Sequence, residues 1–326
     1  MLRNIQPQID KSVEVLQLAS EMSKAYYKKP LIIAYSGGKD SDVLLRIAMD
    51  CLPPTDFEVV NSHTSVDAPE TVYHIREVFA ECEEKGIKAT VHIPRDKDGK
   101  QITMWNLIPK KKMPPTRIVR YCCQELKETS TPNRMTCVGV RKDESVGRGN
   151  RAVFTSFSRG GGVRGGRHFG IEHAKQVFED AKKVSAEFNE PIETPTPYDC
   201  TMIENMKKNN DTIVNPIYEW SDYDIWNYIQ TREVKVNPLY AKGYKRVGCI
   251  GCPMGSYRGM VREFHDYPIY RNNYVKAFDR MIKAREEAGL KNEWKNGEEV
   301  YLWWIGEWTR TVKGQISIDE YMEENK

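Results

Sequence analysis

The 326-residue chain carries 49 Lys and Arg against 46 Asp and Glu, a formal net charge of +3. This near balance excludes a protein that binds nucleic acid through bulk charge, so any anionic partner must contact a local basic patch. No apolar run approaches the ~20 residues of a membrane span, and the first residues lack the apolar core of a secretory signal. We therefore expect a cytoplasmic protein without membrane contact. Eight cysteines are too few for a dense disulfide framework, and clustered ones indicate metal or redox chemistry.

The predicted elements alternate between helices and strands. Apolar residues recur every third position between Gln8 and Lys28, which predicts a leading helix. Strands are predicted at 31–35, 57–63, 89–93 and 135–140, with helices over about 40–50 and 70–85. This order predicts an α/β fold, a Rossmann-like parallel sheet covered by helices. In such sheets ligands bind at the carboxyl ends of strands.

The segment "FSRGGGVRGGRHFG", 157–170, is too rich in glycine for the interior of a strand or helix. It predicts a mobile loop, which is either a linker or a lid over an anionic ligand. We therefore divide the chain into a nucleotide-binding α/β domain at 1–156, this loop at 157–170, and a mostly helical part at 171–326. The last part is rich in aromatic residues, which we expect to pack in its core.

A candidate anion site follows the first predicted strand, in the run "SGGKDS". The run differs from a Walker A loop, because Asp40 stands where that pattern needs Ser or Thr after the lysine. A tight Ser-Gly-Gly turn still presents several N–H groups to one phosphate, and Lys39 adds a full charge. Asp40 is placed to cap the following helix or to orient a metal ion. The predicted phosphate-binding residues are Ser36, Gly37, Gly38, Lys39, Asp40 and Ser41.

"AYSGGKDS" resembles the PP-loop of the adenine nucleotide alpha hydrolases, in particular the phosphoadenylylsulfate (PAPS) and adenylylsulfate (APS) reductase family. "HTSVDAPET", 63–71, and "GVRKDESVGR", 139–148, resemble two further family segments, although His63, Ser65 and Ala68 depart from the first. The resemblance covers roughly residues 30 to 255 and implies a loop that holds phosphate or sulfate beside a bound adenosine. Further nucleotide-binding residues implied by it are Thr64, Glu70, Arg141, Glu144, Ser145 and Arg148.

Two cysteine pairs provide a second signal, the adjacent pair in "RYCCQELKE" and the Cys-x-x-Cys in "GCIGCP". Four thiolates suit tetrahedral zinc or an iron–sulfur cluster, and adjacent cysteines fit the larger cluster better. The arrangement resembles the cluster-bearing APS reductases, although Leu126 replaces an arginine of their pattern. It implies a 4Fe–4S cluster, with zinc as the alternative. The predicted metal ligands are Cys122, Cys123, Cys249 and Cys252. The thiols expected to be buried are Cys51, Cys82, Cys137 and Cys200.

The reductase mechanism that the resemblance implies uses a cysteine in a C-terminal Glu-Cys-Gly-Leu-His segment, and no cysteine follows Cys252 in this sequence. We therefore expect an ATP pyrophosphatase that adenylylates an oxygen of its substrate so that sulfur can displace AMP. PP-loop proteins of DNA phosphorothioation and tRNA thiolation follow this logic. Mg²⁺ would accompany ATP. The expected catalytic residues are Lys39, Asp40, Arg141 and Arg148.

Two other functions stay open, an APS or PAPS reductase that produces sulfite and an adaptor that binds nucleotide without turnover. For the main hypothesis the resemblance implies a cysteine desulfurase as sulfur donor, and DNA or tRNA as substrate. The basic run "PKKKMPPTR", 109–117, adds little to the nucleic-acid expectation, because such runs are usually solvated. The sequence also leaves open whether one of Cys122 and Cys123 is free to carry a persulfide or to leave an iron open.

Overall fold

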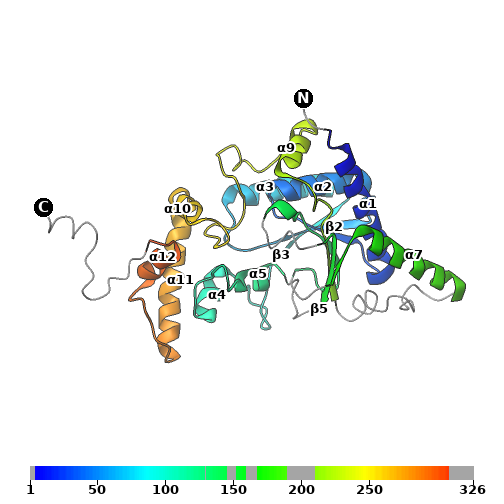
Figure 1. Cartoon of the computed structure of the whole chain (residues 1–326). Coiled ribbons are helices and arrows are strands. Elements are labelled where there is room, and N and C mark those ends of the chain that lie inside the picture. The colour runs from blue at the N-terminus through cyan, green and yellow to red at the C-terminus, as the bar shows by residue number, and fades with distance from the viewer. Residues whose placement is uncertain (1–3, 129, 145–151, 159–166, 189–209, 308–326) are drawn as a thin grey trace, which may run out of the picture. The chain divides into compact units, whose positions relative to one another are not determined.

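A computed structural model describes residues 4–128, 130–144, 152–158, 167–188 and 210–307 (Figure 1). The chain forms two compact units. Unit 1 comprises Met1–Gln101 and Gln124–Gly248, and unit 2 comprises Ile102–Cys123 and Cys249–Lys326. The predicted division at 157–170 stays a prediction, because its middle, 159–166, lies outside the described residues. Within the described ranges no helix has the length and apolarity to cross a bilayer.

Unit 1 contains a seven-stranded sheet with the order β3-β2-β1-β4-β7-β5-β6. The parallel strands are β1 (Leu31–Ala34), β2 (Phe57–Ser62), β3 (Lys88–His92), β4 (Met135–Cys137) and β7 (Asn210–Val214). The antiparallel strands are β5 (Phe154–Ser158) and β6 (Arg167–Phe169). The α/β prediction is confirmed. The loop prediction for 157–170 is wrong at both ends of that segment, where backbone pairing with neighbouring strands overrides the flexibility of the glycine-rich sequence.

Helices flank this sheet (Figure 1). They are α1 (Gln6–Met22), η1 (Ser23–Tyr27), α2 (Lys39–Cys51), α3 (Pro69–Glu84), η2 (Lys142–Glu144), α7 (Ile171–Phe188) and α9 (Asp222–Thr231). The predicted leading helix is confirmed as α1, whose Leu16 and Ala19 are fully buried. In β1 Leu31, Ile32 and Ile33 are all at most 1% exposed, as expected for a central parallel strand covered on both faces.

The strand order indicates where in the sheet the candidate anion site lies. β1 pairs with β2 on one side and with β4 on the other, so the chain direction across the sheet reverses beside β1. Loops that leave the carboxyl ends of two such strands diverge and open a crevice, where α/β proteins bind ligands. The loop from β1 to α2 and the segment that follows β4 both leave the sheet at this point.

Unit 2 is helical. Its helices are α4 (Met104–Lys111), the start of α5 (Tyr121–Leu126), α10 (Tyr257–Asp266), α11 (Pro268–Glu287) and α12 (Gly297–Trp304). α4 and α12 both pack against α11. The ring of Trp304 lies 4.7 Å from that of Tyr274 and 5.4 Å from that of Phe278, measured between centroids. The predicted aromatic core is therefore present in unit 2.

Candidate active site and cysteine group

The hydroxyl group of Ser41 holds the phosphate loop, Ser36–Ser41, in a tight turn by hydrogen bonds to the loop backbone. Ser41 Oγ donates to the carbonyl oxygen of Gly38 at 2.7 Å and accepts from the Gly38 N–H at 3.2 Å. It also accepts from the Ser36 N–H at 3.3 Å. Gly37 has a φ of +73°, and a Cβ there would lie 3.0 Å from Ile75 Cγ1, so glycine alone fits without displacement. The loop thus enters α2 as a tight turn, and N–H groups at such a helix start favour bound anions.

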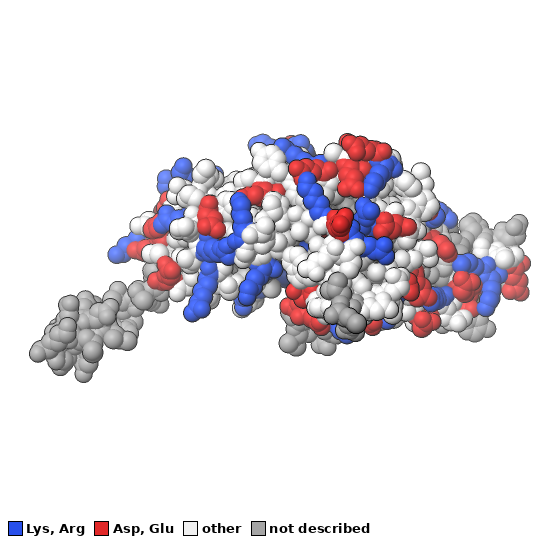
Figure 2. All heavy atoms as spheres, turned by 90° about the horizontal axis from the view of Figure 1, so that it is seen from above, with Lys and Arg blue, Asp and Glu red and all other residues white. Residues whose placement is uncertain are grey.

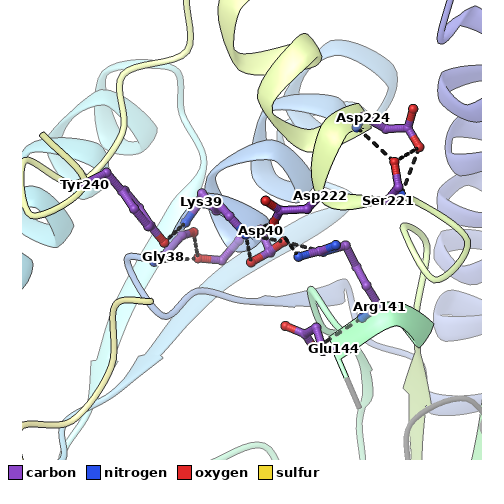
Figure 3. Close-up of polar contacts among 10 residues, drawn as sticks. Gly38, Lys39, Asp40, Arg141, Glu144, Ser221, Asp222, Asp224 and Tyr240 are labelled. Carbon is purple, nitrogen blue, oxygen red and sulfur yellow. Dashed lines mark hydrogen bonds and ion pairs between the residues drawn. The ribbon is translucent and has the colours of Figure 1, made fainter. Parts of the chain in front are cut away.

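Two cations and two carboxylates meet beside this loop (Figure 3). Lys39 Nζ lies 3.2 Å from Asp40 Oδ2 and 2.9 Å from Asp222 Oδ1. Arg141 Nε donates to Asp40 Oδ1 at 2.6 Å, and Arg141 Nη2 donates to Asp222 Oδ1 at 3.1 Å. The side chains of Lys39 and Arg141 are 7% and 5% exposed, whereas that of Asp222 is 64% exposed. Two largely buried cations therefore share two carboxylates, one of which faces solvent.

Asp222 is a site residue that the sequence reasoning missed. It is the first residue of α9, directly after the N-cap Ser221, whose Oγ accepts from the Asp224 N–H. Burial acts to raise the pKa of Asp222. The hydrogen bond and charge of Lys39, followed by those of Arg141, outweigh it, so the pKa lies below its ordinary value. The available signal was an acidic residue at a helix start, but helix starts attract acidic residues without any ligand.

Two side chains from the segment that follows α9 hold the phosphate loop. Tyr240 Oη accepts the N–H of Lys39 at 2.9 Å. Asn237 is fully buried, and its Nδ2 donates to the Gly37 carbonyl oxygen and to Thr71 Oγ1, both at 3.0 Å. These contacts join the loop to residues about 200 positions away in the sequence. The predicted phosphate-binding residues therefore lie in a supported loop, and their role in binding stays a prediction.

The segment after β4 approaches the loop through a glycine. A Cβ on Gly139 would lie 3.0 Å from the backbone carbon of Asp40, so this close approach needs glycine. It brings Arg141 to the charged group described above. The Arg141 N–H donates to Glu144 Oε2 at 3.4 Å, so Glu144 shapes the turn that carries the arginine. The predicted residues Ser145 and Arg148 lie outside the described residues.

The remaining predicted nucleotide-binding residues are Thr64, which lies in the connection between β2 and α3, and Glu70, which lies in the first turn of α3. Thr64 is 2% exposed and donates from Oγ1 to Asp67 Oδ2 at 2.7 Å, which orders the turn before α3. Glu70 Oε1 lies 2.5 Å from Lys242 Nζ. Both residues have protein partners that the sequence did not indicate, and nucleotide binding by them stays a prediction.

The four predicted metal ligands all belong to unit 2. The pKa of the Cys122 thiol is raised, first by its hydrogen bond with Cys123, then by burial and by the charges of Cys123, Cys249 and Cys252. Electrostatic influence of this kind comes from nearby groups, so Cys123, Cys249 and Cys252 lie in the neighbourhood of Cys122. The described residues nevertheless contain no group of three or more His, Cys, Asp or Glu side chains arranged to hold a metal ion. The donor type and number fit an iron–sulfur cluster or zinc, whereas the present side-chain arrangement does not complete a ligand shell.

Other residues of unit 2 hold the backbone of the Cys-x-x-Cys turn in place. Gly251 has a φ of +70°, and a Cβ there would lie 2.5 Å from Phe264 Cζ, which no side chain can tolerate. Tyr274 Oη donates to the Ile250 carbonyl oxygen at 3.0 Å. Arg117 donates to the carbonyl oxygens of Pro253 and Gly255 at 3.0 and 2.9 Å. The backbone of this turn is therefore fixed without a ligand.

The other cysteines were predicted to be buried. This is confirmed for Cys82 and Cys137, whose side chains are inaccessible to solvent. It is wrong for Cys51, which is only partly buried at the end of α2. Burial raises the pKa of both Cys51 and Cys82 to about 11. Cys200 lies outside the described residues.

The sheet order and the turn from β1 into α2 define an α/β protein with a mostly parallel sheet covered by helices. Residues 30–254 match the phosphoadenosine phosphosulfate reductase domain, and the chain belongs to that family. The family membership expected from "AYSGGKDS" and the downstream segments is therefore confirmed.

Individual relatives are distant or cover little of the chain. An uncharacterized protein of Methanocaldococcus jannaschii is 25% identical over 249 residues, which are 73% of this chain and 39% of that protein. The adenosine 5′-phosphosulfate reductase of Rhodococcus erythropolis is 38% identical over 61 residues, 19% of this chain and 25% of that enzyme. The chain thus spans less than half the length of these relatives. A Candida auris phosphoadenylyl-sulfate reductase structure, a phosphate complex, has 14% identity and a TM-score of 0.39, covering 73% of this chain and 87% of that one.

Proposed function

We propose that the chain is an ATP pyrophosphatase that adenylylates an oxygen of its substrate for later displacement by sulfur. The observation that carries this proposal is the pair of carboxylates, Asp40 and Asp222, beside the phosphate loop. Because Lys39 and Arg141 pair with both carboxylates, an anion that takes these cations without bringing a metal, as APS or PAPS would, leaves the carboxylates without a counterion. They suit a polyphosphate that arrives with Mg²⁺, because that ion binds proteins through one or two carboxylates while it keeps the phosphate oxygens as ligands.

In the proposed reaction a substrate oxygen attacks the α-phosphorus of ATP, and the bond from that phosphorus to the bridging oxygen of pyrophosphate breaks. The substrate hydroxyl proton goes to solvent, AMP is transferred to the oxygen, and pyrophosphate leaves with the bond electrons. The N–H groups of the phosphate loop and Lys39 would hold the departing pyrophosphate. Arg141 would stabilise charge on the α-phosphate, because guanidinium donates to two oxygens at once. Mg²⁺, held by Asp40 and Asp222, would offset charge on the phosphates.

For the nucleotide to bind, the present ion pairs must exchange partners. Lys39 and Arg141 each contact both carboxylates. A phosphate would take over the donors of the two cations while the metal takes the carboxylate oxygens, so each group exchanges one oppositely charged partner for another. The exposed Asp222 can move more easily than Asp40, because it sits at the solvent side of the group.

We extend the proposal to unit 2, where Cys122, Cys123, Cys249 and Cys252 would hold a 4Fe–4S cluster, with zinc as the alternative. The effect of the other three cysteines on the pKa of Cys122 and the soft donor set support this extension. The cluster would supply a structural centre or, where one iron has no cysteine ligand, a place for sulfide. A cysteine desulfurase, together with a thiol reductant that is oxidised to a disulfide as it releases the persulfide sulfur as sulfide, is the class of sulfur donor that this chemistry needs.

The experiment is incubation of the protein, purified without oxygen, with ATP, APS and PAPS in separate reactions. The proposal expects pyrophosphate and an adenylylated acceptor from ATP once an acceptor with a free oxygen is present, and free AMP only after a sulfur donor is added. Sulfite from APS or PAPS would instead establish a reductase, a candidate that the similarity to the Rhodococcus erythropolis enzyme favours. Tight binding of nucleotide without product would establish an adaptor. Iron analysis of the same sample separates cluster from zinc.

A nucleic-acid substrate, DNA or tRNA, is the acceptor that we propose to test first. Lys110 and Lys111 end α4, and Lys112 follows as its C-cap. On the face shown in Figure 2, basic and acidic side chains are interspersed, so binding would depend on local runs such as this one. Replacing the three lysines by glutamine should weaken DNA or RNA binding at low salt. Unchanged binding would remove this run from the interface.

A further inference from the structure

A group of three buried polar side chains lies behind the phosphate loop and has no part in the proposed chemistry. Tyr35, Asp42 and His74 are 2%, 5% and 1% exposed. Tyr35 Oη donates to Asp42 Oδ1 at 2.5 Å, and His74 Nε2 lies 2.9 Å from the same oxygen. Tyr35 Oη and His74 Nε2 are 3.0 Å apart. One carboxylate oxygen thus joins the end of β1, the start of α2 and the middle of α3.

Two of these residues flank the loop in the sequence. Tyr35 precedes Ser36, and Asp42 follows Ser41. The inner pair is also bonded, since Ser36 Oγ and Ser41 Oγ lie 3.2 Å apart. The loop is therefore closed by two nested side-chain pairs, 36 with 41 and 35 with 42. Such closure fixes the distance between the two ends of the turn that presents the N–H groups.

His74 connects this closure to α3, which also contacts the loop directly. A Cβ on Gly37 would touch Thr71 Cγ2 and Ile75 Cγ1, and both residues lie within one turn of His74 on that helix. Burial raises the pKa of Asp42, and the hydrogen bonds from His74 and Tyr35 oppose that rise. Polar groups this deeply buried lower stability unless they are paired, so the network needs a reason beyond packing.

The geometry points to Tyr35, Asp42 and His74 as a clasp that positions the phosphate loop for its anion. The clasp acts on the loop and does not touch the reacting atoms, so its members are positioning residues. The inference rests on the proposed function, because the anion is identified as the pyrophosphate part of ATP. It predicts that the clasp controls pyrophosphate affinity and leaves the affinity for AMP almost unchanged.

The test compares two variants that separate binding from stability. Tyr35→Phe opens the outer pair while Asp42 Oδ1 keeps its contact with His74, so the melting temperature should change little. Pyrophosphate affinity should fall about tenfold, because binding must then order the turn that the lost hydrogen bond had held in place. Asp42→Asn keeps an acceptor at Oδ1 but places amide hydrogens at the Oδ2 position, which has no partner among the described residues. It should lower the melting temperature and keep pyrophosphate affinity within about threefold.

Tyr26→Phe is the matched control. Tyr26 Oη is also buried, has no hydrogen-bond partner in the described part of the chain, and lies on η1 away from the loop. Its loss should leave pyrophosphate affinity unchanged. Titration calorimetry with pyrophosphate and with AMP, beside thermal unfolding, measures all three variants.

The outcomes separate the clasp from the proposed function. If affinity follows melting temperature across the variants, or if Tyr35→Phe binds pyrophosphate as the wild type does, the clasp is wrong even when the wild type cleaves ATP. A wild type that binds no pyrophosphate also overturns the clasp. If Tyr35→Phe loses pyrophosphate affinity while the wild type fails to cleave ATP, the clasp stands and the proposed function falls.

Discussion

The phosphate loop of unit 1 and the four-cysteine group of unit 2 differ in how the charges of their side chains are balanced. At the loop each cation has carboxylate partners, and the backbone is held by Ser41, Asn237 and Tyr240. In unit 2 the charges of Cys123, Cys249 and Cys252 all raise the pKa of the Cys122 thiol, so none of them balances a Cys122 thiolate. The charges of the first group are balanced by protein side chains alone. Under our proposal the charges of the second group would be balanced by a metal centre among the sulfurs.

The largest expected effect concerns the loop. Lys39→Ala removes a cation that contacts both Asp40 and Asp222 and leaves those carboxylates with Arg141 as their remaining cation among the contacts described. ATP cleavage should fall by about 100-fold to 1,000-fold, the usual cost of losing one transition-state donor. The rate of pyrophosphate release measures this effect.

Iron content should not change in Lys39→Ala, because the cysteines belong to the other unit. Lys11→Ala is the control, since Lys11 forms an ion pair with Glu219 in which both side chains are nearly half exposed. Such pairs contribute little to stability. A Lys39→Ala enzyme with the wild-type rate would mean that the loop does not hold the leaving group.

A second substitution tests the cysteine side of the comparison. Cys249→Ser should lower iron from about four atoms per chain to less than one, because a hydroxyl is a poor ligand for iron in a cluster. Colour and iron analysis after anaerobic purification measure it. Cys51→Ser is the control in unit 1 and should keep the iron. Zinc in place of iron in the wild-type protein would contradict the cluster and leave a tetrathiolate site.

A smaller effect distinguishes the two carboxylates from each other. Asp222→Asn keeps the shape of the side chain and removes one charge from the exposed side of the group. The affinity for Mg²⁺-ATP should fall about tenfold, whereas AMP binding without metal should stay the same, because only the metal needs the carboxylate. A titration of ATP binding against Mg²⁺ measures this. Glu219→Gln is the control, and an equal loss for AMP would assign Asp222 to the nucleotide instead of the metal.

The sequence predicted the strand, turn and helix around the phosphate loop. "SGGKDS" follows a buried strand and starts a helix, and both elements come from local hydrophobic patterns. Arg141 was found because the resemblance placed a Gly-x-Arg stretch after a strand, and the contact of Gly139 with the loop explains why that stretch begins with glycine. Local pattern and short-range geometry were sufficient for these residues.

Asp222, Asn237 and Tyr240 were missed for a different reason. Each lies about 180 to 200 residues from its loop partner, and neither propensity nor periodicity indicates which distant segments meet. The strands β5 and β7 were missed because single short strands carry little pattern of their own and are fixed by their pairing in the sheet. The metal site that the cysteine spacing indicated stays a prediction, because the described residues contain no group of three or more His, Cys, Asp or Glu side chains arranged to hold a metal ion.

The smallest expected effect is the pH dependence of the charged group. Lys39, and after it Arg141, lower the pKa of Asp222 below that of an ordinary carboxyl group. The ionised form therefore persists as the pH falls through the ordinary carboxyl range. Its contribution to stability is present above the unfolded-state pKa and is lost only as the pH falls through the lower folded-state value. Binding of Mg²⁺-ATP should accordingly stay constant from about pH 8 to about pH 5 as far as Asp222 is concerned.

Removing the cations should move the acid limb of that binding curve to higher pH. The shift should be larger for Lys39→Ala than for Arg141→Gln, because Lys39 has the larger effect on the pKa of Asp222. The Asp222→Asn variant should lack this limb, since its amide does not titrate. Binding of Mg²⁺-ATP as a function of pH in the three variants measures the order. An acid limb at the same pH in the wild type and in Lys39→Ala would show that Asp222 titrates independently of the cations, and the site would then not be the coupled group on which the proposed exchange of partners depends.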